Sequence, residues 1–183
     1  MSLFFKRLDS FYPSGPILIR ASKIADRRGY FSETYKKDLF CSNGIEEDFV
    51  QENESFNLRG VIRGLHFQSK QAKLVSVSRG RILDVYVDIR PGSKTFGKWG
   101  AVCLRLGDGK MLYIPPGFAH GFYTYTRSVV MYKVSRQRDA DAEGAVAWDD
   151  PDIGIHWPKD KYIISDRDLG NKKLSDTPLE DLG

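Results

Sequence analysis

The chain has 183 residues, a length that suits one domain or a domain with arms. Its net charge is +4, but the cations are scattered among 24 acidic residues without a basic run or a nucleic-acid motif, so we expect no nucleic acid as partner. No apolar stretch approaches the ~20 residues of a membrane-spanning helix, so we expect no membrane association. The first residues lack a signal-peptide pattern, and Cys41 and Cys103 are typical of free thiols in a reducing, cytoplasmic compartment. The surplus of positive charge fits a small anionic ligand.

From residue 16 onward, short strand-favouring segments alternate with turn signals. Residues 16–20 predict an early strand, a turn follows at 26–29, and residues 36–44 predict a short helix that ends near Gly44. The later strands are predicted at residues 49–53, 61–67, 74–77, 82–89, 100–106, 111–114, 121–125 and 129–135. Because the apolar residues of segment 82–89 do not alternate strictly, we expect this strand to be buried on both faces or bulged. Short strands at this spacing predict an all-β sandwich or jelly-roll barrel.

Two regions flank this series of strands. Residues 1–15 are expected to form an N-terminal arm, and residues 149–183 form a tail that is rich in proline and aspartate. The tail also carries apolar residues such as Ile155 and Trp157, so we expect it to pack across the barrel. Together these features predict a single domain over residues 1–183.

Residues 59–73 are the stretch around which we expect the function to be organised. This stretch places His66 between Arg63 and Lys73, on a strand and the loop after it. Because a buried cation without a partner is costly, such a strand fits an anionic, solvated cavity. A core histidine with two cations at the surface is equally compatible with the spacing. In a small barrel that holds one ligand, the side chains expected to face the cavity are His66, Lys73, His120 and Tyr132.

The residue types favour acid–base chemistry over other reaction classes. The histidines, His66, His120 and His156, lie far apart without a His-x-His pair, so we expect no bound metal. Neither cysteine lies in an activating motif, and a G-x-S-x-G elbow is absent from the sequence. Histidine suits proton abstraction near neutral pH, and a cation such as Lys73 would stabilise the enolate that forms beside a carbonyl. A tyrosine on the other face could return the proton with inverted configuration, and this chemistry needs no cofactor.

Several long motifs resemble those of a known enzyme family. They are RGVIRGLHFQ, KLVSVSRGRILDVYVDIRPGSKTFGKW, IPPGFAHGF, MYK, WDDPDIGIHWP and ISDRD. With these motifs the chain resembles the dTDP-4-dehydrorhamnose 3,5-epimerases from about residue 16 to 175. The resemblance implies a metal-free cupin-type jelly-roll barrel with an N-terminal strand arm and short peripheral helices, usually a homodimer that exchanges N-terminal strands. It also implies inversion of C3, C5 or both in a nucleotide-linked 4-keto-6-deoxy sugar, with dTDP-4-dehydro-6-deoxy-D-glucose of rhamnose-type biosynthesis as the expected substrate.

The same resemblance implies roles for individual residues. RGLH places the base at His66, and the aspartate that holds its ring falls on Asp168 of ISDRD. KLV places the lysine that faces the enolate at Lys73, and MYK places the acid at Tyr132. The residues that the resemblance places beside the sugar or the nucleotide are Arg28, Glu33, Gln51, Asn53, Arg63, His120, Glu143 and Arg167.

The chain departs from the family pattern in two places. The loop between His66 and Lys73 is shorter than usual, and Arg138 stands where the family commonly has a second tyrosine beside the sugar. The loss of this tyrosine leaves open whether one centre or two are inverted. An arginine at this position could also contact a phosphate.

Other interpretations of single residues and of the whole chain stay open. Lys73 could be a gatekeeper on an edge strand, at least one of Tyr30 and Phe31 is expected in the core, and His156 is expected to be structural. The functional alternatives are a mono-epimerase acting on a GDP- or CDP-linked sugar, a 4-keto sugar isomerase on the same fold, and a non-catalytic sugar-nucleotide binding protein. The isomerase would be expected to carry a second histidine close to His66, which this sequence lacks.

Overall fold

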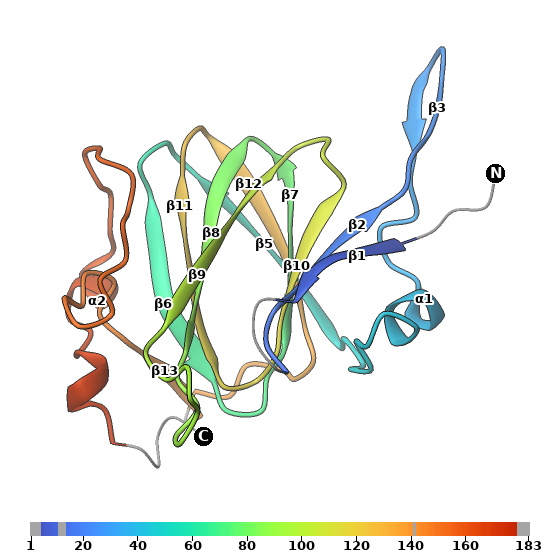
Figure 1. Cartoon of the computed structure of the whole chain (residues 1–183). Helices are drawn as coiled ribbons and strands as arrows, with labels where there is room; N and C mark the ends of the chain where they lie inside the picture. The colour runs from blue at the N-terminus through green and yellow to red at the C-terminus, as the bar shows by residue number, and fades with distance from the viewer. Residues whose placement is uncertain (1–4, 11–13, 141, 179–183) are drawn as a thin grey trace.

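The computed structural model describes residues 5–10 by their backbone and residues 14–140 and 142–178 in full, and the architecture is almost entirely β (Figure 1). Two antiparallel sheets enclose the core. The first sheet has six strands in the order β1 (Phe5–Ser10), β2 (Ile17–Ala21), β10 (Lys110–Ile114), β7 (Lys73–Arg79), β12 (Ser128–Val134) and β5 (Gln51–Asn57). The second has five strands in the order β13 (Glu143–Ala145), β6 (Ile62–Gln68), β11 (Phe118–Thr124), β8 (Arg81–Asp88) and β9 (Trp99–Arg105).

The remaining elements lie outside both sheets. They are the hairpin of β3 (Ile24–Asp26) and β4 (Gly29–Phe31), the helices α1 (Lys37–Cys41) and α2 (Asp166–Leu169), and the 3-10 helix η1 (Leu174–Asp176). The predicted helix forms as α1, and Gly44 after it has a φ of 81°, as a helix-ending glycine often does. Among the helices of the described residues, none has the length and apolar composition that crossing a bilayer requires. The two-sheet arrangement confirms the predicted all-β class.

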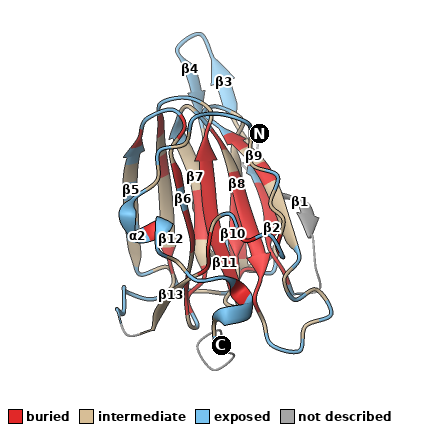
Figure 2. Cartoon of the chain, turned by 90° about the vertical axis from the view of Figure 1, so that its left-hand side faces the viewer, coloured by how far each residue is buried: buried red, intermediate tan, exposed pale blue. Residues whose placement is uncertain are grey.

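The main core lies between the two sheets. Because alternate side chains of a strand point to the same face, each sheet directs one set of apolar residues inward. Buried residues of both sheets form this cluster, among them Val75, Leu112, Val130, Tyr86 and Phe122. Figure 2 shows the burial concentrated in the middle strands, whereas the β3–β4 hairpin is exposed.

The tail covers the outer face of the five-stranded sheet. Ile153 and Leu174 of the tail are buried in one cluster with Val85 and Val87 of β8. Side chains on the other face of β8, such as Tyr86, belong to the main core. Strand β8 is therefore buried on both faces, which confirms the expectation from its irregular apolar pattern.

The N-terminal elements lie at the edge of the barrel. Strand β1 pairs with β2 of the same chain, and residues 1–4 and 11–13 of the expected arm lie outside the described residues. The β3–β4 hairpin projects away from the barrel (Figure 1), and its residues Tyr30 and Phe31 are 52% and 61% exposed. The prediction that at least one of these aromatic residues belongs to the core is wrong for the single chain, because the hairpin pairs only with itself.

Strands β6 and β11 approach each other closely at two glycines. A Cβ atom at Gly64, whose φ is +127°, would lie 2.5 Å from the Cα atom of Gly121. A Cβ atom at Gly121 would lie 2.6 Å from the carbonyl oxygen of Arg63. Backbone contacts this close admit only glycine. His66 and His120 occupy paired positions beside this contact, so the glycines set the distance between the strands that carry the two histidines.

Candidate active site

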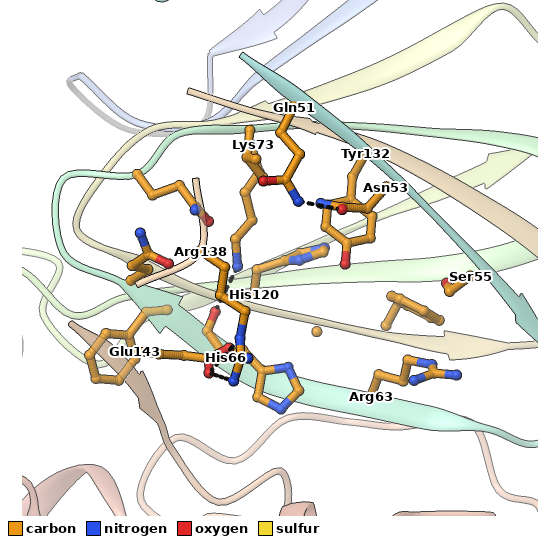
Figure 3. Close-up of a pocket in the computed structure, with 16 residues that line it drawn as sticks. Gln51, Asn53, Ser55, Arg63, His66, Lys73, His120, Tyr132, Arg138 and Glu143 are labelled. Carbon is orange, nitrogen blue, oxygen red and sulfur yellow. Dashed lines mark hydrogen bonds and ion pairs between the residues drawn. The ribbon is translucent and has the colours of Figure 1, made fainter. Parts of the chain in front are cut away.

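A cavity of about 270 Å³ opens between the two sheets (Figure 3). Strands β5, β7 and β12 supply one wall, and β6, β11 and β13 supply the other. The polar side chains that line it are Gln51, Asn53, Ser55, Arg63, His66, Gln68, Gln71, Lys73, His120, Tyr132, Arg138 and Glu143. Most of the residues singled out in the sequence therefore meet in one place, although they come from distant parts of the chain.

His66 is paired with a carboxylate that comes from the tail. Asp168 lies in α2, and its Oδ1 atom is 2.6 Å from Nε2 of His66. Oδ2 of Asp168 accepts a hydrogen bond from the backbone N–H of Gly64 at 3.3 Å. Burial would raise the pKa of Asp168, but its hydrogen bonds with His66, Gly64 and Ser165 hold this pKa below its ordinary value. An ionised carboxylate can only accept, so we place the shared proton on Nε2, which leaves the lone pair of Nδ1 for a substrate.

Lys73 lies on β7, between β10 and β12, so a gatekeeper role on an edge strand is excluded. Its ammonium group donates a hydrogen bond to the carbonyl oxygen of His66 at 3.2 Å. Burial lowers the pKa of Lys73 to about 8, and the negative charges of Glu143 and Asp84 oppose this shift. Lys73 is therefore mostly cationic near neutral pH and can stabilise an oxyanion that forms in the cavity.

Tyr132 faces the cavity from the wall opposite His66 (Figure 3). Burial raises the pKa of its phenol, and the nearby charges of Arg63 and Glu143 act in opposite directions on it. Because the net shift is upward, the phenol keeps its proton near neutral pH and can act as a donor. A ligand held between the sheets would have the imidazole on one face and the phenol on the other.

A second histidine–carboxylate pair lies beside the first. Nε2 of His120 and Oδ1 of Asp84 are 2.7 Å apart, and their side chains are 9% and 0% exposed. The other carboxylate oxygen of Asp84 makes no hydrogen bond to any described residue. Within the described part of the chain, no three His, Cys, Asp or Glu side chains are grouped so that they could hold a metal ion.

At the cavity mouth, ion pairs with two arginines hold the side chain of Glu143 in place. Oε2 of Glu143 accepts hydrogen bonds from Nη2 of Arg138 at 2.8 Å and from Nη2 of Arg167 at 3.0 Å. Burial would raise the pKa of Glu143, but the two guanidinium groups hold it below its ordinary value. Elsewhere along the cavity, the side-chain amide of Gln51 donates to Oδ1 of Asn53 at 2.7 Å.

Arg28 and Glu33 do not meet the other predicted site residues in the single chain. Arg28 lies in the turn of the projecting hairpin, where its side chain is 83% exposed and pairs with Asp26 at 2.6 Å. Glu33 follows the same hairpin, and neither residue lines the cavity. His156, expected to be structural, lies edge-on to Trp99, with 5.7 Å between the ring centres.

The polar residues of this region that were not predicted from the sequence are Ser55, Gln68, Gln71 and Asp84. Gln68 and Gln71 line the cavity, and their side chains donate to the carbonyl oxygens of residues 137 and 136, just before Arg138. Gln68 follows His66 by two positions on one strand, so the alternation of a strand could have placed it on the same face. Asp84 could have been found as a carboxylate in the middle of an apolar strand, because buried acids normally have a partner.

Comparison with known proteins places the chain in one family. The family model for dTDP-4-dehydrorhamnose 3,5-epimerase matches residues 13–176. The dTDP-4-dehydrorhamnose 3,5-epimerase of Methanothermobacter thermautotrophicus is 45% identical over 171 residues, which cover 90% of this chain and 92% of the relative.

Solved structures of the family share the fold. The epimerase RmlC of Legionella pneumophila, in complex with dTDP-4-keto-L-rhamnose, has a TM-score of 0.92 at 36% identity, with 97% of each chain covered. ChmJ of Streptomyces bikiniensis, a 3'-monoepimerase in complex with dTDP-quinovose, has a TM-score of 0.83 at 32% identity, with 88% of this chain and 84% of ChmJ covered. The chain therefore belongs to the dTDP-4-dehydrorhamnose 3,5-epimerase family of isomerases.

Proposed function

We propose that this chain inverts C3, C5 or both in a nucleotide-linked 4-keto-6-deoxy sugar, with dTDP-4-dehydro-6-deoxy-D-glucose as the substrate. The observation that carries the proposal is the position of the His66–Asp168 pair on one wall of the cavity and of Tyr132 on the other. The Legionella relative, in complex with dTDP-4-keto-L-rhamnose, supports this substrate class. In this role the chain would serve rhamnose-type deoxysugar biosynthesis.

The reaction follows from the positions of four side chains. His66 takes a proton from a carbon next to the C4 ketone, and the electron pair of the broken C–H bond moves to the ketone oxygen. Asp168 holds the imidazole ring and stabilises the imidazolium, and Lys73 stabilises the enolate oxygen. Tyr132 then donates its phenolic proton to the same carbon from the opposite face, which inverts the configuration. Proton exchange with water restores both side chains, so no cofactor takes part.

Other residues that line the cavity, together with Arg167 beside Glu143, would hold the substrate around the reacting carbons. The residues in this role are Gln51, Asn53, Arg63, His120, Glu143 and Arg167. The guanidinium group of Arg63 suits the oxygen atoms of the diphosphate, and its position is fixed by a hydrogen bond from Nε to Oδ1 of Asn57 at 2.6 Å.

Arg28 and Glu33 need a second copy of the chain to take part. We propose a homodimer that exchanges N-terminal strands, in which these two residues reach the cavity of the partner. The exposed aromatic side chains of the projecting hairpin, Tyr30 and Phe31, support such an interface. Sedimentation should give twice the mass of one chain, whereas a monomer that remains fully active would contradict this arrangement.

Deuterium incorporation tests the proposed reaction. The protein is incubated in D2O with dTDP-4-keto-6-deoxyglucose, and the sugar is analysed by mass spectrometry and NMR. Label at C3 and C5 in an inverted product would show a 3,5-epimerase, and label at one centre would show a mono-epimerase. Absence of label from the dTDP-, GDP- and CDP-linked sugars would contradict the proposal and favour a non-catalytic binding protein.

Replacing the acid should separate proton removal from inversion. We expect Tyr132→Phe to retain exchange of the substrate proton, because His66 and Lys73 are intact. The inverted product should form about 10²-fold more slowly, since the donor on the opposite face is lost. Both rates come from the same D2O incubation, and normal epimerisation by this variant would remove Tyr132 from the acid role.

A further inference from the structure

Asp168 reaches His66 on a segment that is not part of either sheet, residues 158–168, which we call the strap. The strap docks on β6 through backbone hydrogen bonds. The N–H of Ile62 donates to the carbonyl oxygen of Ile163 at 3.0 Å, and the N–H of Ile163 donates to that of Gly60 at 2.9 Å. The strap passes close to Gly60, where a Cβ atom would lie 2.7 Å from the carbonyl oxygen of Lys161.

The register of this docking determines which strap residue meets His66. Val61 and Ile163 form an isolated parallel bridge, after which the strap enters α2, the helix that contains Asp168. His66 lies five residues after Val61, and Asp168 lies five residues after Ile163. A strap that shifted along β6 would move the carboxylate away from the imidazole. The position of Asp168 therefore depends on what holds the strap upstream of the bridge.

The upstream attachment is a hydrogen bond from a buried tyrosine. The hydroxyl of Tyr123, a residue of β11 that is 2% exposed, donates to Oδ2 of Asp160 at 2.6 Å. Burial and the contact with Asp160 raise the pKa of Tyr123 to about 12, so the phenol stays protonated and remains the donor. Nη2 of Arg59 also lies 3.3 Å from Asp160, but its side chain is 71% exposed, and such ion pairs contribute little.

Tyr123 ties the strap to the strands that carry the site. On β11 it is paired with Ile62 of β6, the residue that hydrogen-bonds to Ile163. The ring of Tyr162 packs edge-on against Tyr123, with 6.2 Å between the ring centres. Tyr123 and Asp160 thus join the strap to both β6 and β11, although neither residue lines the cavity.

We infer that Tyr123 and Asp160 are positioning residues for the His66–Asp168 pair, acting through the register of the strap. This inference rests on the proposed function, in which the pair removes the substrate proton. Neither residue lines the cavity, so we expect them to act on the rate of proton removal and to leave substrate binding unchanged.

Three variants and one control test this inference in the full chain. Tyr123→Phe and Asp160→Ala should each lower kcat for deuterium incorporation by about tenfold or more, because small displacements of a catalytic group have effects of this size. KM should stay within about twofold, since the cavity lining is intact. Asp160→Asn keeps an oxygen that can accept from Tyr123, so it should recover most of the lost rate.

The matched control is Tyr125→Phe. Tyr125 lies two residues further along, stacks edge-on with Tyr123 at 5.1 Å, and its hydroxyl makes no hydrogen bond to a described residue. We expect its kcat to remain at the level of the unmodified chain. Equal kcat values for Tyr123→Phe and Tyr125→Phe would overturn the inference.

A readout without turnover separates positioning from a general loss of folding. The chain has three histidines, so the proton shared by His66 and Asp168 can be assigned in the low-field NMR spectrum by comparison with single histidine variants. We expect this signal to exchange faster with water in Tyr123→Phe and Asp160→Ala at a temperature where both are folded. A lowered kcat with an unchanged signal would overturn the inference. If the unmodified chain incorporates no label, the proposed function fails, whereas the NMR comparison still tests the strap.

Discussion

Two histidine–carboxylate pairs stand beside each other on β6 and β11, and they differ in how far they open to the cavity. The side chain of His66 is 30% exposed, and its carboxylate, Asp168, comes from the strap. The side chain of His120 is 9% exposed, and its carboxylate, Asp84, comes from the neighbouring strand β8. The two contacts are almost equally short, at 2.6 and 2.7 Å.

The two pairs have the same chemical groups but differ in support and exposure, and we expect this difference to separate their roles. Asp84 lies on β8, which is hydrogen-bonded to β11 on one side and to β9 on the other, so both partners of the His120 pair belong to the sheet. Asp168 is held by hydrogen bonds between the strap and β6, which lets a carboxylate support the more exposed His66 without opening the barrel.

The rate of deuterium incorporation should differ most between a variant without His66 and a variant without His120. We expect His66→Asn to lower the rate of deuterium incorporation by about 10³-fold, because the base on that face is lost. His120→Asn should lower it by about tenfold or less, since this ring contributes a contact and no proton transfer. Rates at saturating substrate, together with thermal unfolding curves for both variants, measure the difference. Losses of equal size would mean that the two pairs act together in the chemistry.

The pH dependence of kcat/KM should show an effect of intermediate size, because Asp84 of the His120 pair acts on Lys73. In the proposed reaction Lys73 stabilises the enolate as a cation, and burial lowers the pKa of Lys73 to about 8. Its charge is present below this pH and lost above it, so kcat/KM should fall about tenfold per pH unit on the alkaline side. The charge of Asp84 raises the pKa of Lys73. In Asp84→Asn, kcat/KM should therefore begin to fall at a lower pH. If kcat/KM of Asp84→Asn falls at the same pH as in the unmodified chain, the charge of Asp84 does not act on Lys73, and the His120 pair only forms part of the cavity wall.

The smallest effect is expected at the cavity mouth, away from both pairs. Arg138→Tyr should change KM by only about threefold, because the Arg138 side chain is 65% exposed and Glu143 keeps its contact with Arg167. The informative measurement is the ratio of label at C3 and C5. A changed ratio would make Arg138 a determinant of which centre reacts, and Arg136→Gln on the same segment serves as the control. If Arg138→Tyr lowered kcat as much as His66→Asn does, the expectation of a small effect at the cavity mouth would be wrong.

Much of the fold could be predicted from the sequence because its signals are local. Strand-favouring segments and turn residues located the strands, and the irregular apolar pattern of 82–89 correctly indicated burial on both faces of β8. The aromatic residues of the hairpin were misleading for the same reason. Tyr30 and Phe31 have the composition of core residues, but β3 and β4 pair only with each other.

The candidate site was harder to predict, because it depends on contacts between distant segments. Asp168 looks like an ordinary polar residue of a tail. The strap that brings it to His66 is docked by backbone hydrogen bonds of Gly60 and Ile62, which leave no pattern of side chains, and by a bond between Tyr123 and Asp160, which lie 37 positions apart. The pairing of Asp84 with His120 depends on the register of β8 against β11. The resemblance to a family was therefore needed to connect His66 with Asp168, and the structure was needed to find the strap.

The close contact between Gly64 and Gly121 bears on how variants of this protein would be interpreted. If every position were randomised and active clones were sequenced, both positions should be recovered as glycine, because any larger residue would push β6 and β11 apart. Neither glycine has a side chain that could take part in the reaction, although the N–H of Gly64 donates to Asp168. In such a survey, the absence of any substitution at these two positions would reflect the short distance between β6 and β11. Intolerance to substitution alone would therefore not identify the residues that carry the chemistry.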